Sequence, residues 1–226
     1  MKSPASHLNL IVAIDGPSGV GKSTVARLVA ASLNLPYLDT GKLYRAVGWA
    51  CHKRDIDLEN EPAVSKTVPT LTITAEKGQL YVNGEDASPF LADEAAGRRA
   101  SLVSRYSAVR SHLVHLQQVW GREAGGVMEG RDIGSRVFPE TPFKFYLHAR
   151  SEIRIWRRYK QIGGSLSGVA ADLLARDERD RTRSLDPLQL LPDHIPIDTS
   201  HINAEGTAGI IARLVGMKRD RTSVTL

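Results

Sequence analysis

A glycine-rich stretch near the N-terminus carries the residue types that bind nucleotide phosphates. It runs Gly16-Pro17-Ser18-Gly19-Val20-Gly21-Lys22-Ser23 and fits the pattern G-x-x-x-x-G-K-S/T at every fixed position. In such a loop the glycines let backbone N–H groups point at phosphate oxygens, and Lys22 can reach the β- and γ-phosphates of a nucleoside triphosphate. The hydroxyl of Ser23 can coordinate Mg²⁺. The spacing therefore predicts a phosphate-binding loop; a glycine turn beside a helix is the alternative.

The segments on either side of this loop are those that phosphate binding requires. Residues 10–14 are apolar and rich in β-branched side chains, which predicts a strand buried on both faces, and residues 24–33 have a helical pattern. The N-terminus of that helix adds partial positive charge beside a bound phosphate. We expect the phosphates of a nucleotide to be bound by Gly16, Pro17, Ser18, Gly19, Val20, Gly21, Lys22, Ser23 and Thr24.

Strands and helices alternate along the rest of the chain. Further strands are predicted at residues 36–38, 125–130, 143–147 and 195–198, where Pro196 favours an edge position. Further helices are predicted at residues 42–53, 61–68, 93–123, 151–161, 169–183 and 204–217, followed by a mobile tail over residues 218–226. This alternation predicts an α/β fold with a parallel sheet flanked by helices. Between residues 71 and 82, strand-like alternation around turns predicts a small β insert.

Length, cysteine content and charge limit the classes of protein. The 226 residues suit a single domain, and the lone Cys51 rules out an internal disulfide, so we expect a cytoplasmic protein. The apolar run at residues 10–14 is too short to span a bilayer, and we expect no membrane partner. The net charge of +5 suggests an anionic partner, either nucleic acid or small phosphorylated molecules. The basic excess is concentrated in residues 150–183 without aromatic side chains between the arginines of 176–183, which argues against nucleic acid.

A phosphate-binding loop alone leaves GTPases, large ATPases and small-molecule kinases open. No Asn is followed by Lys in this chain, so the guanine-reading N-K-x-D element is absent, and the length argues against the larger ATPases. A small-molecule kinase needs a second phosphate pocket built from arginines and a mobile basic lid that excludes water during transfer. Arg45 and Arg131 are candidates for the pocket, and the glycine-bracketed segment at about residues 163–184 is a candidate lid.

Four motifs together resemble those of bacterial cytidylate (CMP) kinases. They are Ile14-Asp15-Gly16-Pro17-Ser18-Gly19-x-Gly21-Lys22, Leu38-Asp39-Thr40-Gly41-x-x-Tyr44-Arg45, Gly130-Arg131-Asp132-Ile133-Gly134 and Arg176-Asp177-x-Arg179-Asp180-Arg181-x-Arg183. The resemblance covers nearly the whole chain and implies a P-loop NTPase fold with a five-stranded parallel core, an acceptor-binding insert at about residues 63–100 and a helical lid. It also implies transfer of a phosphoryl group from ATP to CMP and dCMP with Mg²⁺, by a monomer. This chain departs from the family in having Glu129 where Asp is usual.

The resemblance also implies roles for individual residues. It places Thr40, Arg45, Arg131 and Arg183 on the acceptor phosphate, Ser101, Arg110 and Asp132 on cytosine, and Arg176 and Asp180 on the ribose. A guanidinium group binds a phosphate dianion through two hydrogen bonds, and cytosine presents an amino donor that suits a carboxylate. The expected catalytic residues are Lys22, Arg131, Arg157 and Arg158, and the expected metal ligand is Ser23. No general base is expected, because the acceptor phosphate is already mostly dianionic at neutral pH.

Alternative interpretations remain open at this stage. The less favoured alternatives are a solvated surface charge for Arg45 and an ion pair in a loop for Arg131-Asp132. Arg154, Arg157 and Arg158 are spaced i, i+3, i+4, which also fits a solvated helix face. A uridylate or adenylate kinase would keep the loop and the lid but change the base pocket. A nucleotide-triggered binding protein would hold or hydrolyse ATP and ignore monophosphates.

Overall fold

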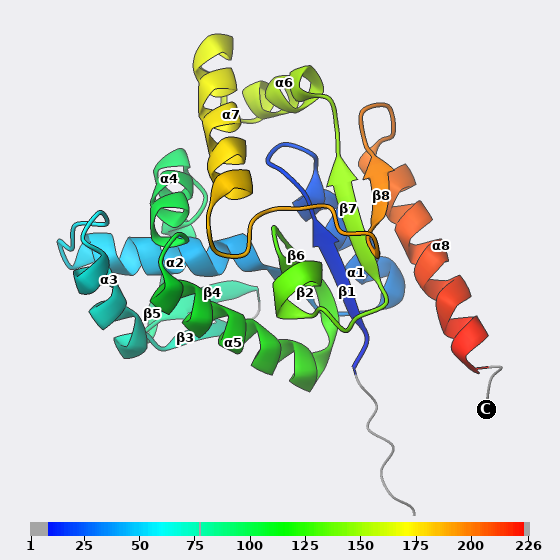
Figure 1. The fold of residues 1–226 in the computed structure, drawn as a ribbon, viewed down its shortest axis with the longest axis horizontal. Coiled ribbons are helices and arrows are strands. Elements are labelled where there is room, and N and C mark those ends of the chain that lie inside the picture. The colour runs from blue at the N-terminus through cyan, green and yellow to red at the C-terminus, as the bar shows by residue number, and fades with distance from the viewer. Residues whose placement is uncertain (1–8, 77, 224–226) are drawn as a thin grey trace, which may run out of the picture.

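A parallel sheet of five strands forms the centre of the molecule, with the order β2-β6-β1-β7-β8 (Figure 1). The computed structural model describes residues 9–76 and 78–223. The strands are β1 Ile11–Asp15, β2 Tyr37–Asp39, β6 Gly126–Gly130, β7 Lys144–His148 and β8 Ile195–Asp198, and all neighbouring pairs run parallel. Every residue of β1 and of β6 is buried, as the apolar pattern predicted. Pro196 lies in an edge strand, as predicted.

Helices cover both faces of this sheet. On one face, Val12 and Ile14 of β1 pack with α1 (Lys22–Leu33) and α8 (Ala204–Ser223) in one apolar cluster. On the other face, Ile11 and Ala13 pack against α5 (Ser107–Ala124) and the helical turn η3 (Ile133–Val137). Successive side chains of a strand point to opposite faces, so a single apolar strand supplies both layers. The α/β architecture with helices on both sides of a parallel sheet is therefore confirmed.

A second apolar cluster lies beside the sheet and joins helices to a small antiparallel sheet. Its residues come from α2 Thr40–Lys53, α3 Glu61–Thr67, η1 Val68–Thr70, β3 Ile73–Glu76, β4 Gln79–Val82, α4 Glu94–Val103 and α5. The small sheet also contains β5 Glu85–Asp86, and η2 Ser88–Phe90 follows it. The sequence predicted only two strands here. The third, β5, pairs with β4 because Asn83 and Gly84 take positive φ angles of 51° and 80° and turn the chain back.

The long helix predicted at residues 93–123 is two helices, α4 and α5, with a break at residues 104–106. Tyr106 has extended backbone angles, φ −88° and ψ 132°. Its side chain is buried, and its hydroxyl donates to the carbonyl oxygen of Leu58 at 2.8 Å. The helix is therefore interrupted where the buried Tyr106 side chain contacts the segment that contains Leu58. The helical periodicity of the sequence does not reveal this break.

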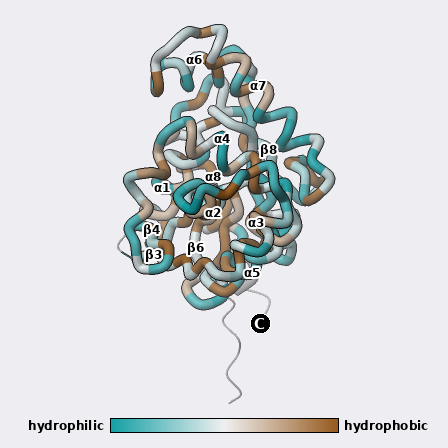
Figure 2. Tube along the Cα trace, turned by 90° about the vertical axis from the view of Figure 1, so that its left-hand side faces the viewer, coloured by the Kyte–Doolittle hydropathy of each residue, from teal (hydrophilic) through white to brown (hydrophobic). Residues whose placement is uncertain are grey.

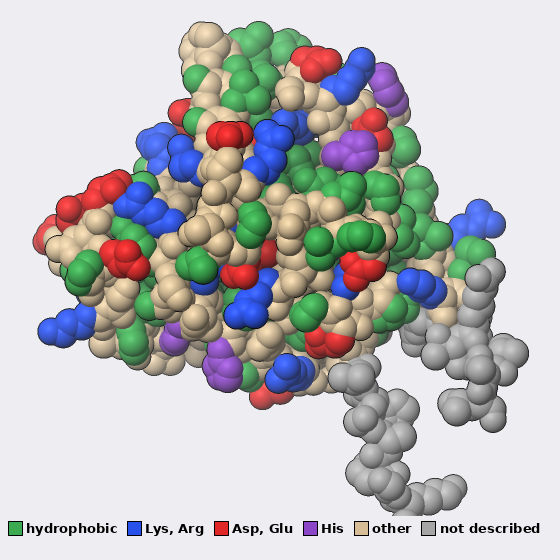
Figure 3. All heavy atoms as spheres, viewed as in Figure 1, with side chains coloured by type: hydrophobic (Ala, Val, Ile, Leu, Met, Phe, Trp, Pro, Cys, Tyr) green, Lys and Arg blue, Asp and Glu red, His purple; other side chains and the backbone are tan. Residues whose placement is uncertain are grey.

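Two helices, α6 (Ser151–Ile162) and α7 (Leu166–Thr182), form the end of the molecule opposite α5 in both Figure 1 and Figure 2. Gly163 and Gly164, with φ 71° and 86°, make the turn between them. The helix predicted from residue 169 begins earlier, at Leu166, because Ser165 caps it and its Oγ accepts the Gly168 N–H at 3.1 Å. Figure 3 shows apolar side chains at the top of the molecule, the end that these helices form. The exposed large apolar side chains of the two helices are Trp156, Ile162, Leu166 and Leu174. The buried apolar side chains of these two helices are Val169 and Leu173 of α7.

The C-terminal helix is longer than predicted. Helix α8 continues through Ser223 instead of ending at Met217, so the tail expected from residue 218 is helical as far as residue 223. Residues 224–226, the rest of that predicted tail, lie outside the described residues.

Candidate active site

A cleft of about 910 Å³ opens between the sheet, the α2–α4 side and the α6–α7 pair. Most of the predicted site residues line it: Ser18, Gly19, Val20, Gly21, Lys22, Ser23, Thr24, Thr40, Arg45, Ser101, Arg131, Asp132, Arg157, Arg158, Arg176, Asp180 and Arg183. Gly16, Pro17 and Arg110 are not part of the lining. The fold therefore brings together, in one cavity, residues from distant parts of the chain.

The glycines of the phosphate-binding loop are required by its backbone. At Gly16, with φ 152°, a Cβ atom would lie 2.2 Å from the carbonyl oxygen of Leu147, so no side chain fits. Gly21 has a left-handed φ of 92°, and a Cβ there would meet no atom within 4 Å. At Gly16 the loop therefore packs directly against the backbone of β7. At Gly21, just before α1 begins, it borders open space.

Lys22 is a buried cation at the bottom of this loop. Its Nζ donates to the carbonyl oxygen of Pro17 at 2.8 Å. Burial and the nearby Arg131 guanidinium lower the pKa of Lys22 to about 7, although the Glu129 carboxylate partly opposes the shift. A multiply charged anion would stabilise the charged form of this buried ammonium group, and the polyphosphate of a nucleotide is such an anion.

Ser23 and Glu129 place two oxygen atoms together beneath the loop. The hydroxyl of Ser23 donates to Oε1 of Glu129 at 2.5 Å, and the hydroxyl of Tyr37 donates to the same oxygen at 3.4 Å. Burial and the Asp39 carboxylate raise the pKa of Glu129, against the effect of Lys22. One hydroxyl and one carboxylate, completed by phosphate oxygens and water, match what Mg²⁺ prefers. In the described part of the chain no three His, Cys, Asp or Glu side chains form a larger metal-binding group.

Arginine side chains concentrate positive charge on the opposite wall of the cleft. Arg131 donates from Nε to Asp180 at 2.7 Å and from Nη2 to the Ser18 hydroxyl at 2.9 Å. Burial, together with Arg131, lowers the pKa of Arg176 to about 10. The Nε atoms of Arg45 and Arg176 are buried without a hydrogen-bond partner among the described residues. Buried, unpaired donors of this kind indicate that an anion completes the site.

Asp132 lies at the base of the same wall and contacts two arginines. Arg110 forms a buried ion pair with it, and Nη2 of Arg183 lies 3.6 Å from it. Burial raises the pKa of Asp132, whereas Arg110 and Arg183 oppose that rise. The N–H groups of Ile133 and Gly134 donate to the carboxylate of Asp15 at 2.8 and 2.7 Å, which fixes the backbone beside Asp132.

The other predicted residues hold protein partners at the rim of the cleft. Arg157 donates to the carbonyl oxygen of Thr199 at 2.6 Å. Arg158 donates to Gln161 at 3.0 Å, and its Nη2 lies 3.9 Å from Glu94 of α4. The hydroxyl of Thr40 donates to the carbonyl oxygen of Glu129 at 2.8 Å. The hydroxyl of Ser101 accepts from Nε of Arg179 at 3.0 Å.

A phosphate-binding loop facing a wall of buried arginines is a geometry that several kinases share, and comparison with known proteins distinguishes among them. The family model described as "Cytidylate kinase" matches residues 12–216. The chain belongs to the cytidylate kinase family.

Relatives of this family member are similar over most of their length. A cytidylate kinase of Nitrosomonas europaea is 37% identical over 212 residues, which cover 92% of this chain and 94% of the relative. A cytidylate kinase of Neisseria meningitidis is 41% identical over 202 residues, 87% of this chain and 93% of the relative. A solved structure of an uncharacterized protein from Eubacterium ventriosum covers 92% of this chain and 99% of its own, with a TM-score of 0.53 and 13% identity. That likeness concerns the fold alone.

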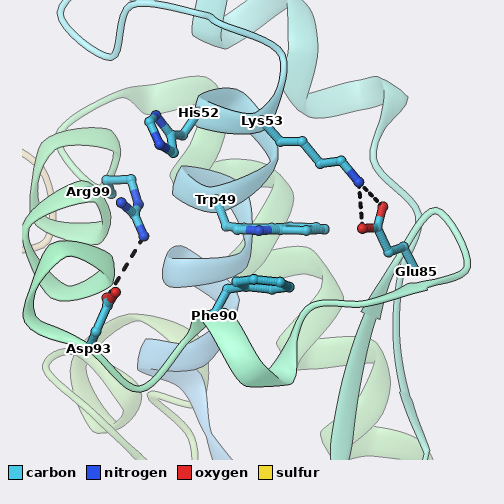
Figure 4. A pocket seen from close by; sticks show the side chains of 7 residues that line it. All are labelled: Trp49, His52, Lys53, Glu85, Phe90, Asp93 and Arg99. Carbon is cyan, nitrogen blue, oxygen red and sulfur yellow. Dashed lines mark hydrogen bonds and ion pairs between the residues drawn. The ribbon is translucent and has the colours of Figure 1, made fainter.

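A smaller hollow of about 420 Å³ lies on α2 of this cytidylate kinase family member, away from the cleft (Figure 4). Trp49 and Phe90 stack there with ring centroids 5.6 Å apart. Lys53 forms an ion pair with Glu85, and Arg99 lies 3.8 Å from Asp93. The Lys53–Glu85 pair connects α2 to β5, and the Trp49–Phe90 stack connects α2 to η2, whereas Arg99 and Asp93 both belong to α4 and its N-cap.

Several residues that shape this kinase site had no distinct signal in the sequence. Arg154 was considered part of a solvated helix face, yet it is 5% exposed and pairs with the buried Asp177. Asp186 accepts from Nε of Arg110 at 2.8 Å, although it lies in a loop outside every motif. Asp15 belongs to the first motif, but only the fold reveals its contact with residues 133 and 134. None of the helices within residues 9–76 and 78–223 is long and apolar enough to cross a membrane.

Proposed function

We propose that the cleft of this enzyme holds ATP on residues 16–24 and CMP against the arginine wall, so that the two phosphates meet between Lys22 and Arg131. As a member of the cytidylate kinase family, the chain is a phosphotransferase that phosphorylates CMP with ATP. The observation that carries the proposed arrangement is the pair of buried cations, Lys22 and Arg131, which both bond to the tip of the same loop at residues 17 and 18.

The proposed donor site rests on the loop and the start of α1. Backbone N–H groups there face the open side of the loop, and the helix dipole favours phosphate at this point. Lys22 would leave the Pro17 carbonyl and contact the β- and γ-phosphates. In the open cleft its pKa is about 7, and a polyphosphate would stabilise its charged form.

The proposed acceptor phosphate site consists of Thr40, Arg45, Arg131 and Arg183. Arg45 supports this role because its Nε is buried without a partner while its Nη1 donates to the Leu91 carbonyl oxygen at 3.0 Å. The hydrogen bond from Nη1 fixes the orientation of the guanidinium group before a ligand binds, and Nε still has a hydrogen bond to donate. The solvated-surface alternative for Arg45 is disfavoured by this burial.

The proposed base and ribose sites lie beside the acceptor phosphate. Asp132 would accept from the cytosine amino group, with Arg110 and Ser101 as donors to the base. Arg176 and Asp180 would contact the ribose hydroxyl groups. We extend the acceptor class to dCMP because only the ribose contacts distinguish it from CMP. A uridylate kinase is the rival function, and it would need a donor at the position of Asp132.

Mg²⁺ is the metal ion we propose, held by Ser23 directly and by Glu129 directly or through water. When bound, the ion neutralises phosphate charge and orients the phosphates. The protein side chains then perform the remaining tasks: Lys22 and Arg131 stabilise charge on the transferring group, while Arg157 and Arg158 approach from the lid side. The acceptor phosphate is already ionised, so no side chain has to remove a proton.

We further propose that the segment at about residues 163–184, which contains α7, acts as the lid, and that the insert at about residues 63–100 carries part of the acceptor site. Four arginines of the basic segment, Arg157, Arg158, Arg176 and Arg183, line the cleft, which supports small nucleotides as partners rather than nucleic acid. We infer that the protein is a monomer. We also infer that it is cytoplasmic, because Cys51 is the one cysteine of the sequence.

Transfer of label from [γ-³²P]ATP to CMP tests this proposal. The wild-type enzyme should convert CMP into labelled CDP in the presence of Mg²⁺. Lys22→Ala should lower kcat by orders of magnitude, whereas Lys66→Ala, at an exposed position of α3, should leave it unchanged. A Lys22→Ala enzyme that keeps more than about a tenth of wild-type turnover, a barrier change below roughly 1.4 kcal/mol, would contradict the assigned role.

A further inference from the structure

Ser18 lies at the tip of the phosphate-binding loop, and each of its polar groups bonds to a side chain from a distant part of the chain. Its N–H donates to Oδ1 of Asp177 at 3.0 Å. Its carbonyl oxygen accepts from Nη1 of Arg154 at 3.0 Å. Its hydroxyl accepts from Nη2 of Arg131 at 2.9 Å. The loop tip is therefore held by α7, by α6 and by the segment after β6 at the same time.

Asp177 and Arg154 are also bonded to each other. They form a buried ion pair, with Asp177 1% exposed and Arg154 5% exposed. A buried ion pair adds little net stability compared with apolar side chains of similar volume, but removing one partner leaves a costly unpaired charge. A contribution to stability therefore does not explain the pair. Its hydrogen bonds to the N–H and the carbonyl oxygen of Ser18 indicate that it holds the backbone of the loop tip.

The backbone of the loop passes very close to this pair. A Cβ atom at Gly19, where φ is 78°, would lie 3.0 Å from both Cβ and the carbonyl oxygen of Arg154. The loop can thus pack directly against the backbone of α6 only because residue 19 is glycine. Helices α6 and α7 therefore contact the loop at its tip, residues 18 and 19.

The loop tip in turn positions the two cations that the proposed mechanism uses. Lys22 donates to the carbonyl oxygen of Pro17, the residue before Ser18, and Arg131 donates to the hydroxyl of Ser18. A shift of the tip would move both cations relative to the transferring phosphoryl group. Misplacement by about 1 Å in an active site costs on the order of 100-fold in rate.

We infer that Asp177 and Arg154 are positioning residues, which fix the tip of the phosphate-binding loop to α7 and α6 and so align Lys22 and Arg131 for phosphoryl transfer. The inference rests on the proposed function, because it assumes that ATP occupies the loop. Asp177 and Arg154 touch neither nucleotide in this arrangement; they act through Ser18. Their loss should therefore change the chemical step more than it changes the binding of ATP.

Steady-state kinetics of Asp177→Ala test this inference. We expect kcat to fall at least tenfold while KM for ATP changes less than threefold, because the backbone N–H groups at the start of α1 still bind phosphate. Glu178→Ala is the matched control, since Glu178 is the next residue of α7 and is exposed; its kcat should equal that of the wild type. A normal kcat in folded Asp177→Ala, or a raised KM for ATP with unchanged kcat, would overturn the inference.

The double variant Arg154→Met/Asp177→Leu separates positioning from stability. It removes both buried charges, so the thermal midpoint should return close to the wild-type value even if Asp177→Ala is too unstable to assay. Because Ser18 still lacks both backbone partners, kcat should remain at least tenfold low. Recovery of kcat together with stability would show that the pair is only structural. Failure of the wild-type enzyme itself to phosphorylate CMP would contradict the proposed function instead.

Discussion

Arg131 donates from Nε to Asp180 at 2.7 Å and thereby joins the segment after β6 to helix α7 across the cleft. Burial alone would raise the pKa of Asp180, but Arg131 and Arg176 outweigh it and hold the pKa below its usual value. Asp180 is therefore ionised and keeps Arg131 in place before a nucleotide arrives. This relation makes Arg131 a preoriented ligand for the acceptor phosphate.

Replacing Arg131 should affect the acceptor more than the donor. Arg131→Ala should lower kcat/KM for CMP at least tenfold, since a charge-assisted pair with phosphate is lost. The affinity for ATP, measured by equilibrium titration, should change far less. Arg98→Ala, at an exposed position of α4, is the control and should behave as wild type. Equal weakening of ATP and CMP would show that Arg131 does not belong to the acceptor site.

Binding of ATP should take up a proton at pH 8. Lys22 has a pKa of about 7 in the open cleft, so it is mostly neutral at this pH, and a bound polyphosphate raises its pKa and charges it. Calorimetry in buffers of different ionisation enthalpy should give an uptake approaching about one proton per ATP at pH 8, falling toward zero near pH 6. Lys22→Arg remains charged throughout and should show no such uptake. An uptake that is the same in both proteins would contradict the role of Lys22.

The same shift predicts how stability without ligand depends on pH. The pKa of Lys22 is lowered from 10.5 to about 7, so the unfolded chain binds this proton more tightly than the folded one. Its contribution therefore makes the folded state more stable as pH rises between those two values. Lys22→Met should remove this part of the pH dependence of the free energy of unfolding, as denaturant titrations at several pH values would show. An unchanged dependence would mean that Lys22 keeps its ordinary pKa.

Glu129 should contribute to metal binding in the presence of nucleotide. Glu129→Gln keeps the size of the side chain and an acceptor for the Ser23 hydroxyl but removes the charge, so the affinity for the divalent ion should fall at least tenfold. Titration with Mn²⁺, followed by electron paramagnetic resonance in the presence of a non-hydrolysable ATP analogue, measures this directly. Glu140→Gln, at an exposed position, is the control. Equal Mn²⁺ affinity in all three proteins would exclude Glu129 from the metal site.

Asp132 should select cytosine by penalising uracil. An ionised carboxylate accepts from the amino group of cytosine, whereas uracil presents an oxygen there, which sets acceptor against acceptor with no proton between them. Asp132→Asn offers an NH₂ group to that oxygen, so the ratio of kcat/KM for CMP to that for UMP should fall about tenfold or more. Asp172→Asn, exposed on α7, should leave the ratio unchanged. A proportional loss on both substrates would indicate a catalytic role instead.

The elements around the loop were predictable from sequence because local pattern determines them. The apolar strand, the glycines at fixed spacing and the following helix are all encoded within residues 10–33. The contact between Ser18 and Asp177 joins residues 159 positions apart, and no local pattern records it. The break at Tyr106 and the burial of Arg154 were missed for the same reason, since a distant partner outweighs helical periodicity.

The rate of ADP formation from ATP and Mg²⁺ with CMP, dCMP, UMP, AMP, GMP or shikimate as acceptor tests the central claim most directly. The Asp132 carboxylate and the arginine wall predict that CMP and dCMP give kcat/KM at least tenfold above every other acceptor. They also predict that ADP forms only slowly when no acceptor is present, because the phosphate pocket is then empty. Equal rates with AMP or UMP, or a rate of ADP formation that does not depend on an acceptor, would contradict it.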